Sequence, residues 1–463
     1  MQERNLHNPQ AVYFIGIGGI GMSALARYYK HAGALVAGYD RTSSSLTAEL
    51  EAEGIAIHYE DNMSLVPTNF TVSNENVLVI YTPAVPAEHS ELNYFKNNNY
   101  TVIKRSAALG HIAATKTTLA IAGTHGKTTT STLLAHLLTQ AGIGCTAFLG
   151  GISKNYQTNL LLSDSPFLVA EADEFDRSFL QLFPQIAVIT ATDADHLDIY
   201  GTADEMKQAF ADFASQVKSD GILILKEGIE LPSSTKYPSL IYRYSFDKKC
   251  DFYASNIRRM ENGHLLFDLH LLDATVTDCE LGILGWVNIE NAVAAAAVAY
   301  LCGADVQVVK KSLANFAGVQ RRFDVQLNNA NCIYIDDYAH HPEELKAAIT
   351  SLREIFSTRK ITGIFQPHLY TRTRDFVDGF AASLSLLDEL ILLDIYPARE
   401  LPIEGVSSKI IFDKVTIANK QLCTKETLLE VLRTKELDVL VTFGAGDIDR
   451  FVQPIREFLE NKK

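Results

Sequence analysis

The sequence predicts an α/β protein of three successive domains, each built on a mostly parallel β-sheet. Its 463 residues are too many for one hydrophobic core. Glycine-rich turns at residues 16–21 and 123–130 each follow an apolar strand-like run and open an amphipathic helix-like segment. After residue 330, four apolar runs end in polar or glycine residues, as strands of open α/β sheets do at a ligand-binding edge. We place the domains at residues 1–107, 108–318 and 319–463.

The composition is that of an ordinary globular protein, with 47% hydrophobic and 21% charged residues. A formal net charge of −14 without a basic stretch argues against a nucleic-acid partner. The polar first residues do not resemble a signal peptide, and the longest apolar run, residues 292–304, is too short to cross a bilayer. We therefore expect no membrane insertion. The six cysteines form no Cys-x-x-Cys pair, which favours buried thiols in the cytoplasm over disulfides or a zinc site.

The first domain opens with the Rossmann arrangement of strand, glycine turn and helix. An apolar run at residues 11–15 leads into glycines, and a second strand-like run at 35–39 delivers Asp40. The glycines allow a diphosphate to approach the backbone, and Asp40 is placed for a ribose or base. The pattern alone is compatible with nicotinamide, flavin and UDP-sugars. The predicted ligand-binding glycines are Gly16, Gly18, Gly19 and Gly21.

A third strand of this domain, at residues 77–81, ends in Thr82 and Pro83. In open α/β sheets ligands bind at the carboxyl ends of the strands. We therefore add Thr82 and Pro83 to the expected ligand-binding residues.

The second domain begins with a phosphate-binding turn at residues 123–130, Gly-Thr-His-Gly-Lys-Thr-Thr-Thr. Its backbone N–H groups and the following helix N-terminus suit a nucleoside triphosphate. Lys127 supplies a cation at the outer phosphates, and the Thr128 hydroxyl is placed for magnesium. The general P-loop pattern has a glycine where this chain has Ile121, so the loop is a shortened variant. The other predicted phosphate-loop residues are Gly123, Thr124, His125, Gly126 and Thr129.

Acidic clusters follow two further strands of the second domain. The run at residues 167–170 ends in Glu171, and the run at 186–190 leads to His196. A carboxylate at the end of a strand near a P-loop is typical of a magnesium site. We therefore predict that Glu171 and His196 bind metal. The neighbouring acids, which fit a solvated rim equally well, are Asp173, Asp176, Asp195 and Asp198.

The remainder of the second domain predicts an added sheet and a helix. Short alternating runs at residues 221–280 indicate an antiparallel extension. Asn288 and Asn291 then stand near the start of an alanine-rich helix. The residues alone favour helix capping for both, with contact to a purine as the alternative.

The third domain repeats the α/β pattern. Arg321 and Arg322 form a paired cation in a linker, and a strand-like run at residues 332–335 leads into Asp336, Asp337 and, further on, His341. This group has no accompanying serine or cysteine nucleophile. The ends of the strands therefore predict a ligand-binding edge, not a hydrolytic triad.

Taken together, these motifs resemble the Mur ligases over almost the whole chain. They are residues 16–22, 123–130, 171–180, 194–198, 321–324 (Arg-Arg-Phe-Asp), 336–342 (Asp-Asp-Tyr-Ala-His-His-Pro), 371–375 (Thr-Arg-Thr-Arg-Asp) and 444–448. The resemblance implies a UDP-sugar-binding Rossmann-like domain, a central P-loop ATPase domain and a Rossmann-like C-terminal domain. It is strongest for the branch that uses ATP to join L-alanine to UDP-N-acetylmuramate through an acyl phosphate.

The resemblance also implies residue roles, with ATP and Mg²⁺ as cofactors. Thr128, Glu171 and His196 would hold metal, and Asn291 would contact the adenine. Lys127, His196, Arg322 and His341 would be catalytic, and Asp337 would lie beside ATP and the amino acid. We expect a cytoplasmic monomer or weak homodimer. The chain departs from the family pattern at Ala191, Val287 and Leu369, where asparagine, histidine and arginine are common.

Three other interpretations compete with this one. A peptidoglycan-recycling ligase would join a whole peptide to UDP-N-acetylmuramate. A nicotinamide-dependent oxidoreductase would use the first glycine turn and leave the P-loop unexplained. A regulatory protein that senses UDP-sugars would not need His196 or the group at residues 336–341. Phosphate release with UDP-N-acetylmuramate, measured with and without L-alanine, separates these alternatives.

Overall fold

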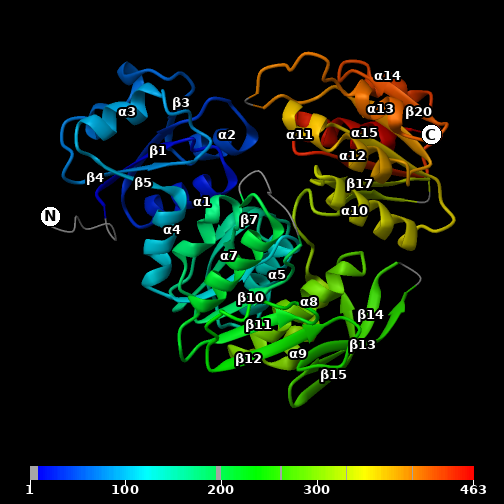
Figure 1. The fold of residues 1–463 in the computed structure, drawn as a ribbon, viewed down its shortest axis with the longest axis horizontal. Helices are drawn as coiled ribbons and strands as arrows, with labels where there is room; N and C mark the ends of the chain where they lie inside the picture. Colours follow the sequence, from blue (N-terminus) through cyan, green and yellow to red (C-terminus); the bar gives the residue numbers. More distant parts are fainter. Residues whose placement is uncertain (1–8, 194–199, 261–262, 330, 399, 463) are drawn as a thin grey trace. The chain divides into compact units, whose positions relative to one another are not determined.

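The computed structural model describes residues 9–193, 200–260, 263–329, 331–398 and 400–462 (Figure 1). It contains sheets of five, ten and six strands, in that order along the chain. Residues 1–259, 266–282 and 288–317 form one compact unit, and residues 260–265, 283–287 and 318–463 form a second. The first unit holds the five-stranded sheet and most of the ten-stranded sheet, and the second holds the six-stranded sheet.

The five-stranded sheet has the order β3-β2-β1-β4-β5, and its pairs are parallel. β1 lies between β2 and β4, so the chain winds in opposite directions on its two sides. This is the switch point at which such sheets bind ligands, and the glycine turn follows it directly. The elements are β1 (Ala11–Ile15), α1 (Ile20–His31), β2 (Leu35–Tyr39), α2 (Ser45–Ala52), β3 (Ala56–His58), β4 (Val77–Tyr81), α3 (Ser90–Asn97), β5 (Thr101–Lys104) and α4 (Arg105–Ala114).

The ten-stranded sheet has the order β15-β14-β13-β12-β11-β10-β6-β9-β7-β8. The P-loop strand β6 pairs in parallel with β9 on one side and β10 on the other. The strands that end in the predicted acidic clusters therefore flank the P-loop strand. The elements are β6 (Thr117–Ala122), α5 (Lys127–Gln140), β7 (Thr146–Ser153), β8 (Thr158–Leu161), β9 (Phe167–Ala172), β10 (Ile186–Ile189), α7 (Ala203–Ser215), β11 (Ile222–Lys226), β12 (Leu240–Ser245), β13 (Phe252–Arg259), β14 (Leu265–Leu271), β15 (Ala274–Leu281), α8 (Val287–Leu301) and α9 (Val306–Asn315).

The antiparallel extension begins later than the sequence predicts. β11 pairs in parallel with β10 and with β12, and β12 pairs in parallel with β13. Only the last part, β13 to β15, follows the sheet edge through short turns, which antiparallel neighbours allow. The crossover helix α7 returns the chain to the same sheet edge and makes the β10–β11 pair parallel. The alternation of residue types does not reveal this direction.

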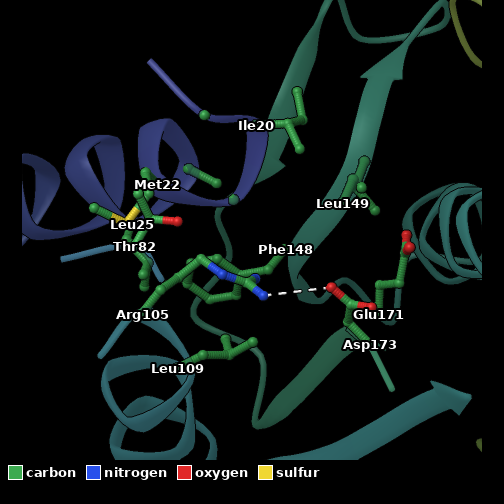
Figure 2. A pocket seen from close by; sticks show the side chains of 14 residues that line it. Ile20, Met22, Leu25, Thr82, Arg105, Leu109, Phe148, Leu149, Glu171 and Asp173 are labelled. Atoms are coloured by element: carbon green, nitrogen blue, oxygen red, sulfur yellow. Dashed lines mark ion pairs between the residues drawn. The ribbon is translucent and has the colours of Figure 1, made fainter. Parts of the chain in front are cut away.

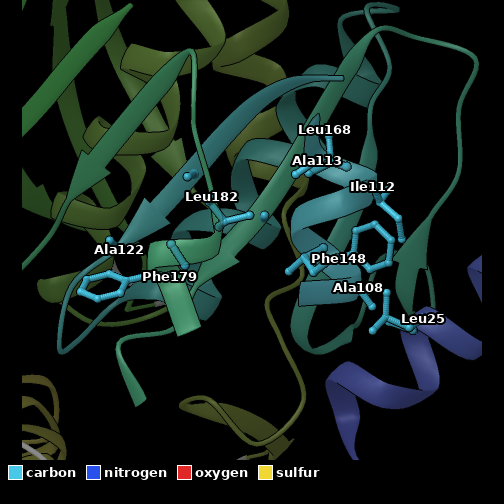
Figure 3. Packing of buried hydrophobic residues seen from close by; sticks show 14 of the residues in the cluster. Leu25, Ala108, Ile112, Ala113, Ala122, Phe148, Leu168, Phe179 and Leu182 are labelled. Carbon is cyan, nitrogen blue, oxygen red and sulfur yellow. The ribbon is translucent and has the colours of Figure 1, made fainter. Parts of the chain in front are cut away.

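A hydrophobic core connects the five-stranded and ten-stranded sheets of the first unit (Figure 3). Leu25 of α1 and Ala108 and Ile112 of α4 belong to the same buried cluster as Phe148 of β7 and Leu168 of β9. The five-stranded sheet and the parallel part of the ten-stranded sheet thus share buried apolar surface. Removal of that surface from water is the main force that holds them together.

The six-stranded sheet of the second unit has the order β16-β17-β21-β18-β19-β20. β16 and β17 are antiparallel, and the other pairs are parallel. The predicted α/β class is therefore confirmed here too. The elements are β16 (Asp324–Asn328), β17 (Ile333–Asp337), α10 (Pro342–Ile355), β18 (Ile361–Phe365), α11 (Tyr370–Asp375), α12 (Val377–Leu384), β19 (Glu389–Leu393), α13 (Lys409–Lys414), β20 (Lys420–Cys423), α14 (Leu428–Arg433), β21 (Val439–Phe443) and α15 (Val452–Asn461).

Within the described ranges, no helix combines the length and hydropathy needed to cross a bilayer. All six cysteines are free thiols.

Candidate functional site

The phosphate-binding turn connects β6 to α5 and is anchored to the end of β10. Gly123 has φ +130° and Gly126 has φ +79°, backbone conformations that side chains other than glycine rarely adopt. A Cβ at Gly123 would overlap the Thr190 hydroxyl. The backbone N–H of Thr124 donates to the carbonyl of Ala191 at 3.1 Å. The buried Thr124 hydroxyl has no hydrogen-bond partner among the described residues, so it is available to a phosphate oxygen.

Lys127, the first residue of α5, is held by two acceptors. Its Nζ donates to the Gly123 carbonyl at 2.6 Å and lies 2.7 Å from Oε2 of Glu174. The two side chains are 12% and 1% exposed. Burial by itself lowers the pKa of Lys127, but the carboxylates of Glu174, Asp173 and Glu171 outweigh it and raise the pKa. Lys127 therefore carries a full positive charge at the start of α5.

Glu171 lies on β9 directly beside the P-loop strand, opposite Ile121. A Cβ at Gly150 would overlap its carboxylate, so this glycine leaves room for the Glu171 side chain. Thr128 is buried in the first turn of α5. The other predicted metal ligand, His196, lies outside the described residues, as do Asp195 and Asp198. Among the described residues, no three histidine, cysteine or acidic side chains gather as a metal site.

A pocket of about 250 Å³ lies between the first glycine turn and the strands beside the P-loop (Figure 2). One wall is apolar and includes Met22, Leu25 and Phe148. Charged side chains also line the pocket, and Arg105 lies 3.5 Å from Asp173. The remaining lining residues are Gly19, Ile20, Gly21, Ala24, Thr82, Leu109, Leu149, Gly150 and Glu171. The pocket thus places the first glycine turn beside Glu171, which lies on the strand next to the P-loop strand.

The first glycine turn is held by its own neighbours. Gly16 has φ +88°, and a Cβ there would lie 2.5 Å from the Thr82 methyl group. The carboxylate of Asp40 accepts from the backbone N–H of Gly18 at 2.8 Å and of Thr42 at 3.1 Å. Asp40 therefore orders the turn, and its predicted contact with a ribose stays a prediction. Pro83 is exposed at the end of β4.

The capping role predicted for Asn288 and Asn291 is wrong. Helix α8 begins at Val287, so both asparagines lie inside its first turns, where they are buried. The Asn291 amide donates to Asn288 Oδ1 at 3.1 Å, and its oxygen accepts from the Thr130 hydroxyl of α5 at 3.1 Å. Asn291 also packs against Gly126, because a Cβ at that glycine would lie 2.6 Å from Asn291 Oδ1. The asparagine pair therefore supports the phosphate-binding turn.

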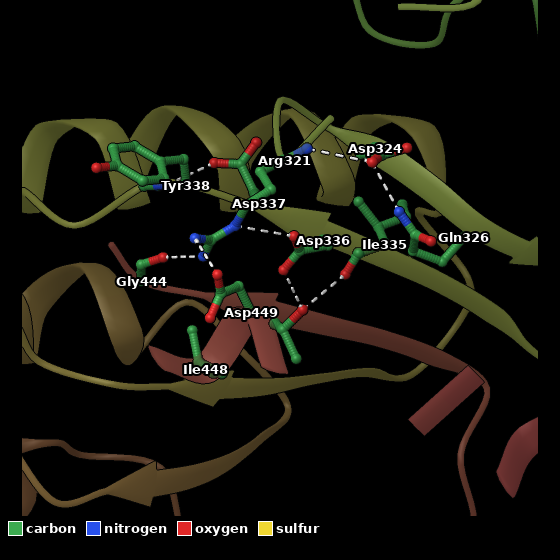
Figure 4. A network of polar contacts seen from close by, with 12 residues as sticks. Arg321, Asp324, Gln326, Ile335, Asp336, Asp337, Tyr338, Gly444, Ile448 and Asp449 are labelled. Carbon is green, nitrogen blue, oxygen red and sulfur yellow. Dashed lines mark hydrogen bonds and ion pairs between the residues drawn. The ribbon is translucent and has the colours of Figure 1, made fainter. Parts of the chain in front are cut away.

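In the second unit, Asp337 ends strand β17 and binds backbone N–H groups (Figure 4). Its two oxygens accept from Phe323 at 2.7 Å and from Ala339 at 2.8 Å. Burial raises the pKa of this carboxyl group. Arg322 stacks its guanidinium over the Tyr338 ring at 5.0 Å. Asp337 thus fixes the turn that presents Arg322.

The adjacent carboxylate, Asp336, joins this turn to the sheet. It is 1% exposed, and burial raises its pKa to about 6. One oxygen lies 3.2 Å from Nε of Arg321, and the other accepts from the Thr442 hydroxyl of β21 at 2.6 Å. The Arg321 backbone has φ +62°. The network holds this left-handed residue in place.

His341 stands at the start of α10. Its backbone N–H and that of His340 both donate to Oε2 of Glu344, at 3.1 and 2.9 Å. Burial disfavours the charge of Glu344, but the His340 ring and Arg322 outweigh burial and hold its pKa well below the usual range. The His341 ring packs edge-on against Phe376. Glu344 therefore orders the segment that carries both histidines.

Comparison with known proteins covers nearly the entire chain. Three family models match in order: the Mur ligase family catalytic domain at residues 11–117, the Mur ligase middle domain at 121–299, and the Mur ligase glutamate ligase domain at 321–446. The chain is 55% identical to a UDP-N-acetylmuramate–L-alanine ligase from Parabacteroides distasonis, with 98% of each chain covered. It belongs to the Mur ligase family.

Other Mur ligases agree with this assignment. The enzyme named UDP-N-acetylmuramate–L-alanine ligase from Flavobacterium johnsoniae is 47% identical, with 98% of this chain and 99% of that one covered. The crystal structure of a UDP-N-acetylmuramate–alanine ligase from Thermotoga maritima gives a TM-score of 0.80 at 28% identity, covering 98% of this chain and 100% of that one. A murein peptide ligase from Psychrobacter arcticus shares the fold, with a TM-score of 0.70 at 22% identity, covering 98% of this chain and 99% of that one.

The departures from the Mur ligase pattern have identifiable places in the structure. Ala191 contributes its backbone carbonyl to the phosphate-binding turn, a contact that any side chain permits. Val287 is an exposed residue at the start of α8. Leu369 precedes α11 with φ +70°, an unusual conformation for leucine.

The structure groups the predicted site residues of this Mur ligase within each unit. In the first unit Gly19, Gly21, Thr82 and Glu171 line the pocket, and the phosphate-binding turn follows the strand beside Glu171. In the second, Arg322 interacts electrostatically with Asp337 and Glu344, and Glu344 accepts from the His341 backbone N–H.

Sequence reasoning did not single out Glu174 or Arg105. The signals for these two residues were the acidic run that continues past Glu171 and the basic pair at the end of β5.

Proposed function

We propose that this Mur ligase joins L-alanine to the lactyl carboxylate of UDP-N-acetylmuramate, with ATP as the energy source, in peptidoglycan precursor synthesis. The relatives at 55% and 47% identity carry that activity in their names and match along the full chain. The observation that carries the proposal is the pocket, which puts a diphosphate-type glycine turn next to Glu171 and, on the neighbouring strand, the P-loop.

The chemistry explains the need for ATP. A carboxylate is a poor electrophile, so one of its oxygens first attacks the γ-phosphorus and ADP leaves. The alanine amine then attacks the carbonyl carbon of the acyl phosphate, and inorganic phosphate departs with the C–O bond electrons. The first step brings two anions together, so its barrier is largely electrostatic. Lys127, fixed by Gly123 and Glu174, supplies the positive charge at the phosphate-binding turn.

The described residues fit a magnesium ion. Thr128 offers a hydroxyl oxygen at the phosphate-binding turn, and Glu171 offers a carboxylate from the adjoining strand β9. Hydroxyl, carboxylate and phosphate oxygens are the ligands that this cation prefers. His196 joins the proposed set on the family resemblance. When bound, magnesium offsets the charge of the phosphates and polarises them.

The remaining assignments are part of the same proposal. The UDP-sugar is assigned to Gly16, Gly18, Gly19, Gly21, Asp40, Thr82 and Pro83, and the nucleotide to residues 123–129 with Asn291, Arg322 and Asp337. His341 and Arg322 are assigned to the reaction centre beside the amino acid. We place the domain boundaries near residues 107 and 318. Because ATP and UDP-sugars are intracellular metabolites, we assign the enzyme to the cytoplasm, as a monomer or weak homodimer.

Phosphate release tests the proposal directly. The purified protein, ATP and magnesium should release phosphate rapidly only when UDP-N-acetylmuramate and L-alanine are both present. Replacement of L-alanine by the tripeptide L-alanyl-γ-D-glutamyl-meso-diaminopimelate should give much slower release. Preference for the tripeptide would instead assign the recycling activity, and no release with either acceptor would refute the proposal.

A further inference from the structure

Arg105 is the one basic side chain among the described residues that line the pocket. It is the first residue of α4, and neither the first glycine turn nor the P-loop includes it. Its side chain is 23% exposed and points toward Asp173 (Figure 2). Two acidic residues, Glu171 and Asp173, share the lining with it. An anionic ligand in this pocket therefore meets one protein cation.

The guanidinium of Arg105 spans the two sides of the pocket. On one side it packs against the glycine turn, because a Cβ at Gly21 would lie 2.8 Å from Nη1. On the other side Nη2 lies 3.5 Å from Oδ2 of Asp173, which follows β9. Glycine at position 21 thus makes room for this guanidinium. The charge therefore lies between the first glycine turn and the acidic end of β9.

This position leaves Arg105 able to bind a ligand. A guanidinium has five N–H donors in a fork that matches a carboxylate or phosphate. Its contact with Asp173 at 3.5 Å is longer than the 2.7–2.9 Å typical of a charge-assisted hydrogen bond. Asp173 therefore orients the arginine without saturating it.

Two anionic groups of the substrate compete for this cation: the diphosphate and the lactyl carboxylate. The N-terminus of α1 already suits the diphosphate, since its N-cap Gly19 makes no side-chain hydrogen bond and the first N–H groups of a helix have no partner within it. Arg105 lies toward β9, whose end adjoins the P-loop strand. The carboxylate must reach that end of the pocket to meet the γ-phosphate.

We propose that Arg105 binds the carboxylate of the sugar substrate and thereby selects a sugar acid over its neutral counterpart. The inference rests on the proposed function. The apolar wall formed by Met22, Leu25 and Phe148 receives the methyl-bearing parts of the ligand, while the guanidinium pairs with the acid.

Calorimetric titration of the full-length protein, without ATP, tests the inference with two ligands. UDP-N-acetylmuramate carries the lactyl carboxylate, and UDP-N-acetylglucosamine has the same nucleotide, diphosphate and ring without it. Arg105→Gln should weaken UDP-N-acetylmuramate about 10- to 100-fold, the loss expected for a charged hydrogen-bond pair. The affinity for UDP-N-acetylglucosamine should change less than about two-fold. Arg105→Lys keeps the charge and should recover part of the loss.

Lys104→Gln is the matched control. Lys104 adjoins Arg105 in sequence, is 46% exposed, and pairs with Asp176 at 2.8 Å outside the pocket lining. Lys104→Gln removes one positive charge, as Arg105→Gln does. It should leave the affinities for UDP-N-acetylmuramate and UDP-N-acetylglucosamine within about two-fold of the wild-type values. Unfolding temperatures of all variants confirm that each is folded.

The possible outcomes are distinct. Equal weakening of both ligands by Arg105→Gln would assign Arg105 to the diphosphate and overturn the inference. Unchanged affinities would overturn it as well. If UDP-N-acetylglucosamine binds too weakly to measure, uridine diphosphate serves as the carboxylate-free ligand. Wild-type protein that binds no UDP-N-acetylmuramate would refute the proposed function, whereas a wild type that binds it and a variant that binds equally well refute only the role of Arg105.

Discussion

The buried pair of Lys127 and Glu174 makes a quantitative prediction about stability. Lys127→Met keeps most of the side-chain length and removes the charge, so Glu174, 1% exposed, loses its ammonium contact. Burial already raises the pKa of Glu174, and Lys127 opposes that shift. Without Lys127 the carboxyl group will bind a proton in the folded state. At pH 7, neutralising a carboxyl group of ordinary pKa 4.5 costs about 3.4 kcal/mol, because each pH unit corresponds to about 1.4 kcal/mol.

The free energy of unfolding of Lys127→Met should therefore fall by about 3 kcal/mol at pH 7, within the range known for broken buried ion pairs. The sign of the pH dependence follows from linkage. A carboxyl group whose folded pKa exceeds its unfolded pKa contributes stability below about pH 4.5 and loses it as pH rises toward the folded pKa. The deficit of the variant should thus grow by about 1.4 kcal/mol per pH unit from about pH 5 to 7.

Urea unfolding followed by circular dichroism, without nucleotide, measures this deficit at several pH values. The double variant Lys127→Met/Glu174→Gln should recover most of the loss and remove its pH dependence. Lys104→Met is the control, since its pair with Asp176 is solvent-exposed, with side chains 46% and 35% accessible, and should cost under about 1 kcal/mol. A deficit that stays constant with pH, or that Glu174→Gln fails to relieve, would refute the reasoning.

Three further predictions concern the reaction and its ligands. Glu171→Gln preserves size but removes the charge that we propose binds magnesium. The rate should therefore fall, and the magnesium concentration for half-maximal rate should rise. An unchanged magnesium titration would mean that another acid holds the ion. Heavy oxygen in the lactyl carboxylate should appear once in the released phosphate by mass spectrometry, and unlabelled phosphate would exclude the acyl phosphate. Gly18→Val should abolish UDP-N-acetylmuramate binding in calorimetry, because its Cβ would lie 2.7 Å from the Thr47 methyl group and 2.9 Å from Asp40 Oδ2. Wild-type protein should give no comparable heat with NAD, NADH or NADP, and tight NADH binding without a response to the sugar would favour the oxidoreductase.

Local sequence patterns were sufficient to predict the elements that carry the chemistry. The strand at Ala11–Ile15, the turn from Gly123 to Lys127 and the strand that ends near Glu171 all lie where the hydrophobic pattern and the glycines indicate. Such features depend on neighbours within a few residues: apolar periodicity, left-handed glycines and the N-terminus of a helix. The α/β class and the three sheets followed from them.

Pairing direction and register were decided by the tertiary structure. Strands β10 to β13 are parallel, although the sequence predicted antiparallel pairing from residue 221 onward. Side chains alternate between the two faces of a strand in both kinds of sheet, so alternation does not reveal the pairing direction. Asn288 and Asn291 resemble capping residues in the sequence, yet they lie within α8 and pack on the P-loop helix. Thr130, which donates to Asn291, is far away along the chain.

By itself, then, the amino-acid sequence determined the α/β elements, the two phosphate-type turns and, through its motifs, the Mur ligase family. Only the tertiary structure decided that Glu174 holds Lys127 and that Arg105 lies between Gly21 and Asp173. These contacts join residues far apart in the chain, so they depend on which strands are neighbours in the sheets. They also depend on burial, which selects Glu174 from the acidic run as the partner of Lys127. Local residue patterns do not contain that information.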